Sequence, residues 1–385
     1  MKTDPHQIQT DLIHAGEVEE RIEGAVVLPL FQSATYASDE ASSYDEIRYL
    51  RLNNSPNHRV LHRKLAAVAG GEDAVVTASG MAAISTALLA LLKSGDHLLA
   101  QDCLYGGTHT FLTEQAPDLG ITCDLVPGDD IASWEQALRP TTRLVYVETM
   151  SNPLLGVPDL EAVVRFARER QLISIIDNTF ASPVNYRPLE HGFDLEVHSA
   201  TKYLNGHSDI VAGCVIGQRE LIRPIARQLN YLGGTLDPHA CFLLHRGMKT
   251  LALRVREQNA TGQRLAEFLE AHPAVDRVNY PGLPSHPQHD LAERLFAGCG
   301  GVLSFDLVAP EAAPGLLGRL SLAVSAPSLG GVETLVTRPA ATSHAGLEPE
   351  ERGRMGIGDG LIRVAVGIEA AEDLCADFEG ALQSL

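Results

Sequence analysis

The sequence has few lysines and no closely spaced cysteine pair. Only five lysines occur among its 385 residues, at positions 2, 64, 93, 202 and 249, and 49 acidic against 30 basic residues give a formal charge of −19. This charge argues against binding to nucleic acid or anionic membranes through bulk electrostatics. The six cysteines include no Cys-x-x-Cys pair, which argues against a disulfide framework or a cysteine zinc site and indicates a reducing, cytoplasmic compartment.

Long apolar runs are also missing. The longest uncharged run, near residues 82–92, is too short to cross a bilayer, and the polar first sixteen residues lack the apolar core of a signal peptide. The pairs His58/His62 and His286/His289 have spacings compatible with a metal, but no nearby carboxylate or thiol completes a ligand set. We therefore expect these histidines on the surface, no metal site and no membrane contact.

Helix and strand patterns alternate through the middle of the chain. Residues 1–60 show little regular period and are predicted to form an extended arm. Beyond them, β-prone runs at 74–77, 144–147, 173–176, 195–197 and 211–216, with a helix over 159–170, predict a mainly parallel sheet covered by helices. A helix over 250–269 and a strand over 301–307 predict a smaller C-terminal α+β domain. The chain is therefore predicted to consist of an arm (1–60), a larger domain (61–245) and a C-terminal domain (246–385).

Three predicted strands end in polar residues: Glu148, Asp177 and Ser199. The carboxyl ends of parallel strands meet at one crevice, so we expect these residues to converge there. Lys202 follows closely, between hydroxyl residues and a Gly-His turn, and is poorly explained as a solvated charge. A partly neutral lysine amine can form a Schiff base with an aldehyde, and a buried Asp177 could pair with a protonated ring nitrogen. The alternative is that Asp177 only caps a turn.

Two further segments suit a flat, phosphorylated ligand. Gly80 lies where a strand meets a helical run, so the backbone N–H groups there could hold a phosphate, although a plain helix N-cap explains the same pattern. Ser199 and Thr201 could add hydroxyl donors. Tyr105 stands beside two glycines and could stack on a ring, although such a tyrosine is also common in cores.

The chain resembles the Cys/Met-metabolism family of pyridoxal-phosphate enzymes, which includes cystathionine γ-synthase, cystathionine γ-lyase, cystathionine β-lyase and methionine γ-lyase. The resemblance rests on DNTFASP at 177–183, HSATKY at 198–203, LGGTLDPH at 232–239, RGMKTL at 246–251, YPGLPSH at 280–286 and SLGG at 328–331. It implies fold type I, the aspartate-aminotransferase fold, with pyridoxal 5′-phosphate as the cofactor. It also implies small amino-acid substrates and a homotetramer of two active dimers.

The resemblance also implies roles for individual residues. Lys202 resembles the Schiff-base lysine and proton shuttle, and Asp177 the partner of the pyridine nitrogen. The arm motif places Tyr49 and Arg51 at the neighbouring subunit's phosphate, with one extra residue before Pro56. The remaining carried-over roles are phosphate binding by Gly80, Met81, Ser199 and Thr201, ring stacking by Tyr105, and support of the substrate carboxylate by Arg363, Asn152 and Ser328.

The residue before Ser328 bears on the reaction. Relatives often have Glu there in γ-synthases and γ-lyases, Tyr in β-lyases and Val in methionine γ-lyases, whereas this chain has Pro327, as in plant-type γ-synthases. Cystathionine γ-synthase is therefore the leading prediction, cystathionine γ-lyase the first alternative, and methionine γ-lyase or cystathionine β-lyase come after these. An inactive regulatory protein that binds the cofactor is the alternative from another class.

Overall fold

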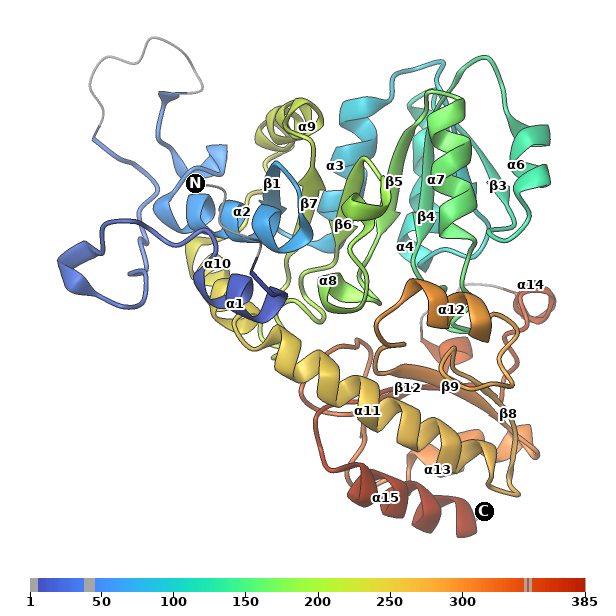
Figure 1. Cartoon of the computed structure of the whole chain (residues 1–385). Helices are drawn as coiled ribbons and strands as arrows, with labels where there is room; N and C mark the ends of the chain where they lie inside the picture. The colour runs from blue at the N-terminus through green and yellow to red at the C-terminus, as the bar shows by residue number, and fades with distance from the viewer. Residues whose placement is uncertain (1–5, 38–45, 343–344, 346–347, 385) are drawn as a thin grey trace.

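The computed structural model describes residues 6–37, 46–342, 345 and 348–384. Figure 1 shows a larger sheet with its helices in the upper part of the view and a smaller sheet below it, alongside the long helix α11 (Leu251–Glu270). Within the described ranges, no helix is long and apolar enough to cross a membrane. The predicted domain boundaries after residues 60 and 245 stay a prediction, and the second boundary falls within α10 (Pro238–Met248).

The larger sheet has seven strands in the order β1-β7-β6-β5-β4-β2-β3. The five strands from β6 to β3 pair in parallel, whereas β7 runs antiparallel to both β6 and β1. The predicted mainly parallel sheet is confirmed, with β7 as its reversed strand. The bounds are β1 Asp73–Thr77, β2 His97–Gln101, β3 Thr122–Val126, β4 Thr142–Glu148, β5 Ile173–Asp177, β6 Leu195–His198 and β7 Gly213–Gly217.

Helices cover both faces of this sheet, which is why its central strands are apolar along their length. On one face, Leu88 of α3 and Leu229 of α9 belong to a buried cluster with the sheet. On the other face, Leu65 of α2 and Phe166 of α7 belong to a second cluster. The helices of this part are α2 Pro56–Ala69, α3 Gly80–Leu91, α4 Gly106–Thr110, α5 Ala116–Asp118, α6 Ile131–Ala137, α7 Leu160–Glu169, α8 Ser182–Asn185 and α9 Arg219–Leu232.

Local sequence fixes where the main helices begin. The Asp159 side chain accepts a hydrogen bond from the backbone N–H of Ala162 and caps α7. Ser55 caps α2, whose first residue is Pro56, and the helix ends at Gly70, where φ is +76°.

The smaller sheet has five strands in the order β10-β11-β12-β9-β8. Apart from the parallel pair β10 and β11, its neighbours are antiparallel. Phe305 and Phe378 pack edge to face in its core, between the sheet and α15. The predicted α+β character of the C-terminal part is confirmed. The bounds are β8 Val275–Asn279, β9 Val302–Leu307, β10 Val324–Ser325, β11 Leu335–Thr337, β12 Ile362–Ala365, α12 His289–Leu295, α13 Ala313–Leu317, α14 Pro349–Arg354 and α15 Ala371–Gln383.

Two local expectations were wrong. The segment before residue 60 contains a helix, α1 (Ile8–His14), although the rest of its described part is largely irregular. The histidine pairs are not surface pairs, because His58 is fully buried and His286 is 6% exposed. Instead, His58 lies within hydrogen-bonding distance of the Ser55 hydroxyl and the Leu236 carbonyl, and His62 accepts a hydrogen bond from the Val76 N–H. A four-residue spacing does not reveal such backbone partners.

Candidate active site

A cavity of about 730 Å³ lies at the carboxyl ends of the parallel strands. Its walls come from the ends of β4, β5 and β6, from the start of α3, and from residues 327–329 and β12 of the C-terminal part. The expected convergence of Glu148, Asp177 and Ser199 is confirmed, since all three line this cavity. The lining also includes Gly80, Met81, Tyr105, Asn152, Thr201, Lys202, Ser328 and Arg363.

Lys202 presents its amine to the cavity. Its Nζ donates a hydrogen bond of 2.6 Å to the Ser328 hydroxyl. Burial, together with the positive charge of Arg363, lowers the pKa of Lys202 to about 8. Lys64 also has its pKa lowered to about 8, mainly by burial, but it donates to the Leu12 and Ile13 carbonyls and does not line the cavity. Among the described lysines, Lys202 is therefore the one that combines a lowered pKa with a place in the cavity lining.

Arg363 lies on β12 and points its guanidinium at the same place. Its two terminal nitrogens donate to Asn152 Oδ1 at 2.9 Å and to the Ser328 carbonyl at 2.8 Å. Its Nε has no hydrogen-bond partner among the described residues, although the side chain is only 7% exposed. Burial lowers the pKa of Arg363 to about 10, so it remains a cation near neutral pH. A buried guanidinium with an unused donor suits a carboxylate ligand.

Ser328 contacts both Lys202 and Arg363, and its backbone conformation is unusual. Its φ is +112°, a region that residues other than glycine rarely adopt. In this conformation its hydroxyl accepts from Lys202 while its carbonyl accepts from Arg363. Backbone strain of this kind persists where the surrounding structure over-determines it, and it is common at ligand sites.

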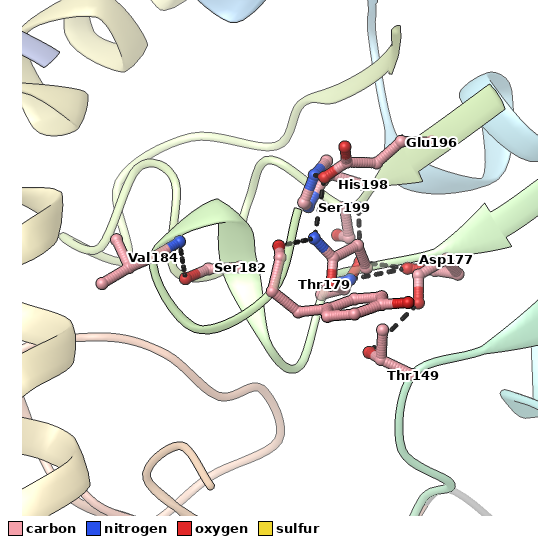
Figure 2. Close-up of polar contacts among 10 residues, drawn as sticks. Thr149, Asp177, Thr179, Ser182, Val184, Glu196, His198 and Ser199 are labelled. Carbon is pink, nitrogen blue, oxygen red and sulfur yellow. Dashed lines mark hydrogen bonds and ion pairs between the residues drawn. The ribbon is translucent and has the colours of Figure 1, made fainter. Parts of the chain in front are cut away.

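Asp177 ends β5 and is held by the turn that follows it (Figure 2). Its Oδ1 accepts from the Thr179 N–H at 2.9 Å and from the Thr179 hydroxyl at 2.5 Å, and the Thr179 hydroxyl in turn accepts from the Ser199 N–H at 2.8 Å. Burial raises the pKa of Asp177, while the hydrogen bonds from Thr179 and the charge of His198 oppose this rise. Thr179 thus connects the strand-end carboxylate to β6, a link that the sequence did not reveal.

The start of α3 forms a close-fitting cradle. Ser79 caps the helix by accepting from the Ala82 N–H at 3.0 Å, and the first N–H groups of the helix, from Gly80 on, have no intrahelical acceptor. A Cβ added to Gly80 would lie 2.8 Å from Ser199 Cβ, so only glycine fits there. Thr201 lines the cavity, but its hydroxyl already exchanges hydrogen bonds with the Ala212 backbone.

Tyr105 and Glu148 also line the cavity. Tyr105 is 47% exposed, and its backbone N–H donates to Glu148 Oε1 at 2.7 Å. Burial and the nearby charge of Asp177 raise the pKa of Glu148 well above its usual range. Two adjacent buried carboxyls disfavour simultaneous ionisation. The place of Glu148 at a strand end was the signal that pointed to it.

Tyr49 and Arg51 do not line this cavity. Arg51 donates to the Asn230 carbonyl at 2.8 Å, and its guanidinium lies 5.9 Å from the centre of the Tyr49 ring. Both belong to the blue segment before α2, part of which extends away from the body of the molecule in Figure 1. Their predicted role at a neighbouring subunit stays a prediction.

Comparison with known proteins identifies the chain. The model of the family "Cys/Met metabolism PLP-dependent enzyme" matches residues 9–383. The chain belongs to this family. Cystathionine β-lyase of Bacillus subtilis is 41% identical over 98% of this chain and 97% of its own length. The chloroplastic cystathionine γ-synthase 1 of Arabidopsis thaliana is 41% identical over 97% of this chain and 68% of its own length.

A solved structure supports the same assignment. The crystal structure of cystathionine γ-lyase from Lactobacillus plantarum, in complex with L-serine, superposes with a TM-score of 0.93 and 36% identity, covering 98% of this chain and 99% of that one. The fold is therefore the expected fold type I. The cofactor of this family is pyridoxal 5′-phosphate, and the protein is a pyridoxal-phosphate-dependent enzyme of sulfur amino-acid metabolism.

The residues around the cavity fit this cofactor. Lys202 offers a partly neutral amine for an aldehyde, the glycine cradle of α3 offers N–H groups for a phosphate, and Asp177 is a buried acid suited to a ring nitrogen. Arg363 keeps an unused donor for the carboxylate of an amino acid. Among the described residues, no group of three or more His, Cys, Asp or Glu is arranged to hold a metal ion.

Proposed function

We propose that the protein catalyses trans-sulfuration at the γ-carbon of an activated homoserine or a cysteine-derived amino acid, with cystathionine γ-synthase as its activity. The observation that carries the proposal is the arrangement of Lys202, Ser328 and Arg363. A substrate whose carboxylate binds Arg363 would lie beside the Lys202 amine, because Ser328 contacts both side chains. That geometry suits proton removal from the α-carbon.

Each side of the cavity has one task in this proposal. The bound cofactor supplies an electron sink for the negative charge that forms on the substrate. Lys202 would hold the cofactor and would move protons between neighbouring carbons of the substrate. Asp177 would pair with the ring nitrogen, and Tyr105 would stack on the ring. The remaining roles are phosphate binding by Gly80, Met81, Ser199 and Thr201, with Tyr49 and Arg51 from a neighbouring subunit, and carboxylate binding by Arg363, Asn152 and Ser328.

Pro327 supports the γ-synthase reaction over its alternatives. It lines the cavity directly before Ser328, where it adds neither a charge nor an N–H donor. The Arabidopsis γ-synthase and the Bacillus β-lyase are both 41% identical to the chain, so these similarities do not decide between the reactions. Cystathionine γ-lyase is the second candidate, because the Lactobacillus structure, which bears that name, matches nearly the whole chain.

Product analysis tests the proposal. The purified protein is incubated with O-acyl-homoserines in the presence and absence of cysteine, and separately with cystathionine and methionine. A γ-synthase forms cystathionine from an O-acyl-homoserine and cysteine. Hydrolytic cleavage of cystathionine to cysteine, 2-oxobutyrate and ammonia identifies a γ-lyase, and cleavage to homocysteine, pyruvate and ammonia identifies a β-lyase. Lys202→Ala should abolish turnover, whereas the exposed Lys93→Ala should retain it. Cofactor binding without turnover of any substrate would favour the regulatory alternative.

A further inference from the structure

Two buried polar side chains lie one turn apart on α11, the long helix that follows α10 and runs alongside the smaller sheet (Figure 1). Arg254 is 4% exposed and Gln258 is fully buried. Residues four positions apart share one face of a helix. Burial lowers the pKa of Arg254 to about 10, so it remains a cation near neutral pH. A charge and an amide in such a place are costly unless hydrogen bonds satisfy them.

Arg254 holds the turn that follows Lys202. Its Nη1 donates to the Tyr203 carbonyl at 2.9 Å, and Tyr203 is the residue directly after Lys202. Its other nitrogens donate to a carbonyl near the end of α10 and to the N-cap residue of α11. The N–H of Gly206 closes the turn on the Lys202 carbonyl, and a Cβ added to Gly206 would overlap the guanidinium. The turn therefore packs directly on Arg254.

Gln258 holds the two other segments that meet at Lys202. Its Nε2 donates to the Gly331 carbonyl at 2.8 Å and to the Val366 carbonyl at 3.3 Å. Gly331 lies in the loop that begins at Ser328, and Val366 directly follows β12, the strand of Arg363. Carbonyl oxygens can only accept, so the amide has to direct its nitrogen at them. One side chain thus fixes both the loop and the end of the strand.

The segments held by α11 contact one another at the cavity. A Cβ added to Gly330 would lie 2.7 Å from the Tyr203 nitrogen, so the loop packs closely on the turn. The Lys202 amine donates to the Ser328 hydroxyl at 2.6 Å. The Ser328 carbonyl in turn accepts from Arg363 at 2.8 Å. Three cavity residues therefore meet on segments that are all bound to one face of α11.

We propose that Arg254 and Gln258 are positioning residues for the reaction site. Arg254 fixes the turn that carries Lys202. Gln258 fixes the loop of Ser328 and the strand of Arg363, so that the carboxylate site stays aligned with the amine. The inference rests on the roles proposed above for Lys202 and Arg363, and it does not depend on which sulfur amino acid is the substrate. Because the two side chains hold different segments, their loss should have different effects.

The first test removes the donor at position 258. Gln258→Met keeps an unbranched side chain of similar size but cannot donate to the two carbonyls. The cofactor-loaded, full-length protein is titrated with L-serine, the amino acid bound in the Lactobacillus structure, and Kd is followed by the absorbance of the cofactor. We expect Kd for L-serine to rise about tenfold and Kd for the cofactor to stay unchanged. Gln258→Glu keeps the shape without the donor, so it should act alike if the first variant does not fold.

The second test changes the side chain that holds the Lys202 turn. Arg254→Lys keeps the positive charge but offers one nitrogen in place of three. The stripped protein is mixed with pyridoxal phosphate at pH 8, and the rate of attachment is followed by absorbance. We expect this rate to fall about tenfold, with a smaller change in Kd for L-serine than in Gln258→Met. Arg254→Gln, which keeps a donor without the charge, is the second variant at this position.

The next residue on α11 provides a matched control. Asn259 exchanges hydrogen bonds with the Asn185 amide and accepts from the Gly300 N–H at 2.9 Å, and none of these residues lines the cavity. Asn259→Ser should lower the thermal midpoint without changing the attachment rate or Kd for L-serine. The midpoint of every variant is measured and the assays are run well below it, because purely structural side chains would change the midpoint alone.

Three results would overturn the proposal. They are unchanged L-serine binding in a folded Gln258 variant, unchanged attachment in a folded Arg254 variant, and equal losses in Asn259→Ser. The outcome is separate from that of the substrate assays. A natural protein that binds the cofactor and L-serine but forms no cystathionine would refute the proposed γ-synthase activity and leave this inference standing.

Discussion

Replacing Gly80 by alanine should close the phosphate cradle at the start of α3. The added Cβ would lie 2.8 Å from Ser199 Cβ and 3.0 Å from Ser199 Cα and Oγ, closer than Cβ atoms normally approach. Ser199 is tied to Thr179 through its N–H, so it cannot move aside without disturbing the turn that holds Asp177. Overpacking of this kind costs about 1–3 kcal/mol. We therefore expect cofactor affinity to fall by about 10- to 100-fold.

The measurement is a titration of the stripped protein with pyridoxal phosphate, with far-ultraviolet circular dichroism as a check of folding. Gly380→Ala is the matched control, because Gly380 lies within the helix α15 and a Cβ added there meets nothing within 4 Å. That variant should bind the cofactor normally and be slightly more stable, since alanine is the better helix residue. If Gly80→Ala folds and binds the cofactor as tightly as the natural protein, the phosphate does not lie at the start of α3.

Three further predictions concern Lys202, Arg51 and Pro327. The pKa of Lys202 is about 8, and only its neutral amine attacks an aldehyde. The rate of cofactor attachment should therefore rise about tenfold between pH 7 and pH 9. A rate that is constant or falls over this range would contradict the assignment. Mixed dimers of Arg51→Ala and Lys202→Ala subunits should recover activity if Arg51 serves the neighbouring subunit, and no recovery despite proven subunit exchange would refute the shared site. Pro327→Glu adds a carboxylate that can attract the distal ammonium of cystathionine. The substitution should lower KM for cystathionine more than for an O-acyl-homoserine, by at most about tenfold. Equal effects on both substrates would limit Pro327 to a backbone role.

The sequence predicted those parts of the fold and site that depend on local pattern. The apolar runs before Glu148 and Asp177 identified β4 and β5, and parallel pairing then brings both residues together, as Cα partners across the two strands. By contrast, neither β2 nor β3 was predicted. The edge strand β3 is only partly buried for most of its residues, whereas β2 is buried throughout but is only five residues long and begins and ends with polar residues.

Other parts of the site depend on contacts distant in sequence. Arg363 reaches Asn152 across 211 positions, and only the family resemblance pointed to that partnership. Ser328 has a positive φ and contacts both Lys202 and Arg363, an arrangement that local sequence does not encode. His58 was misplaced for the same reason, since its partner Leu236 lies 178 positions away.

The central claim is that Lys202 alone holds the cofactor, although Lys64 has a similarly lowered pKa. Borohydride reduction of the cofactor-loaded protein, followed by proteolysis and mass spectrometry, tests this claim directly. We predict a single pyridoxyl-phosphate label on the peptide that contains Lys202, and no label in Lys202→Ala. A label on Lys64 or another lysine, or an unlabelled Lys202 in protein that retains its cofactor, would contradict the account.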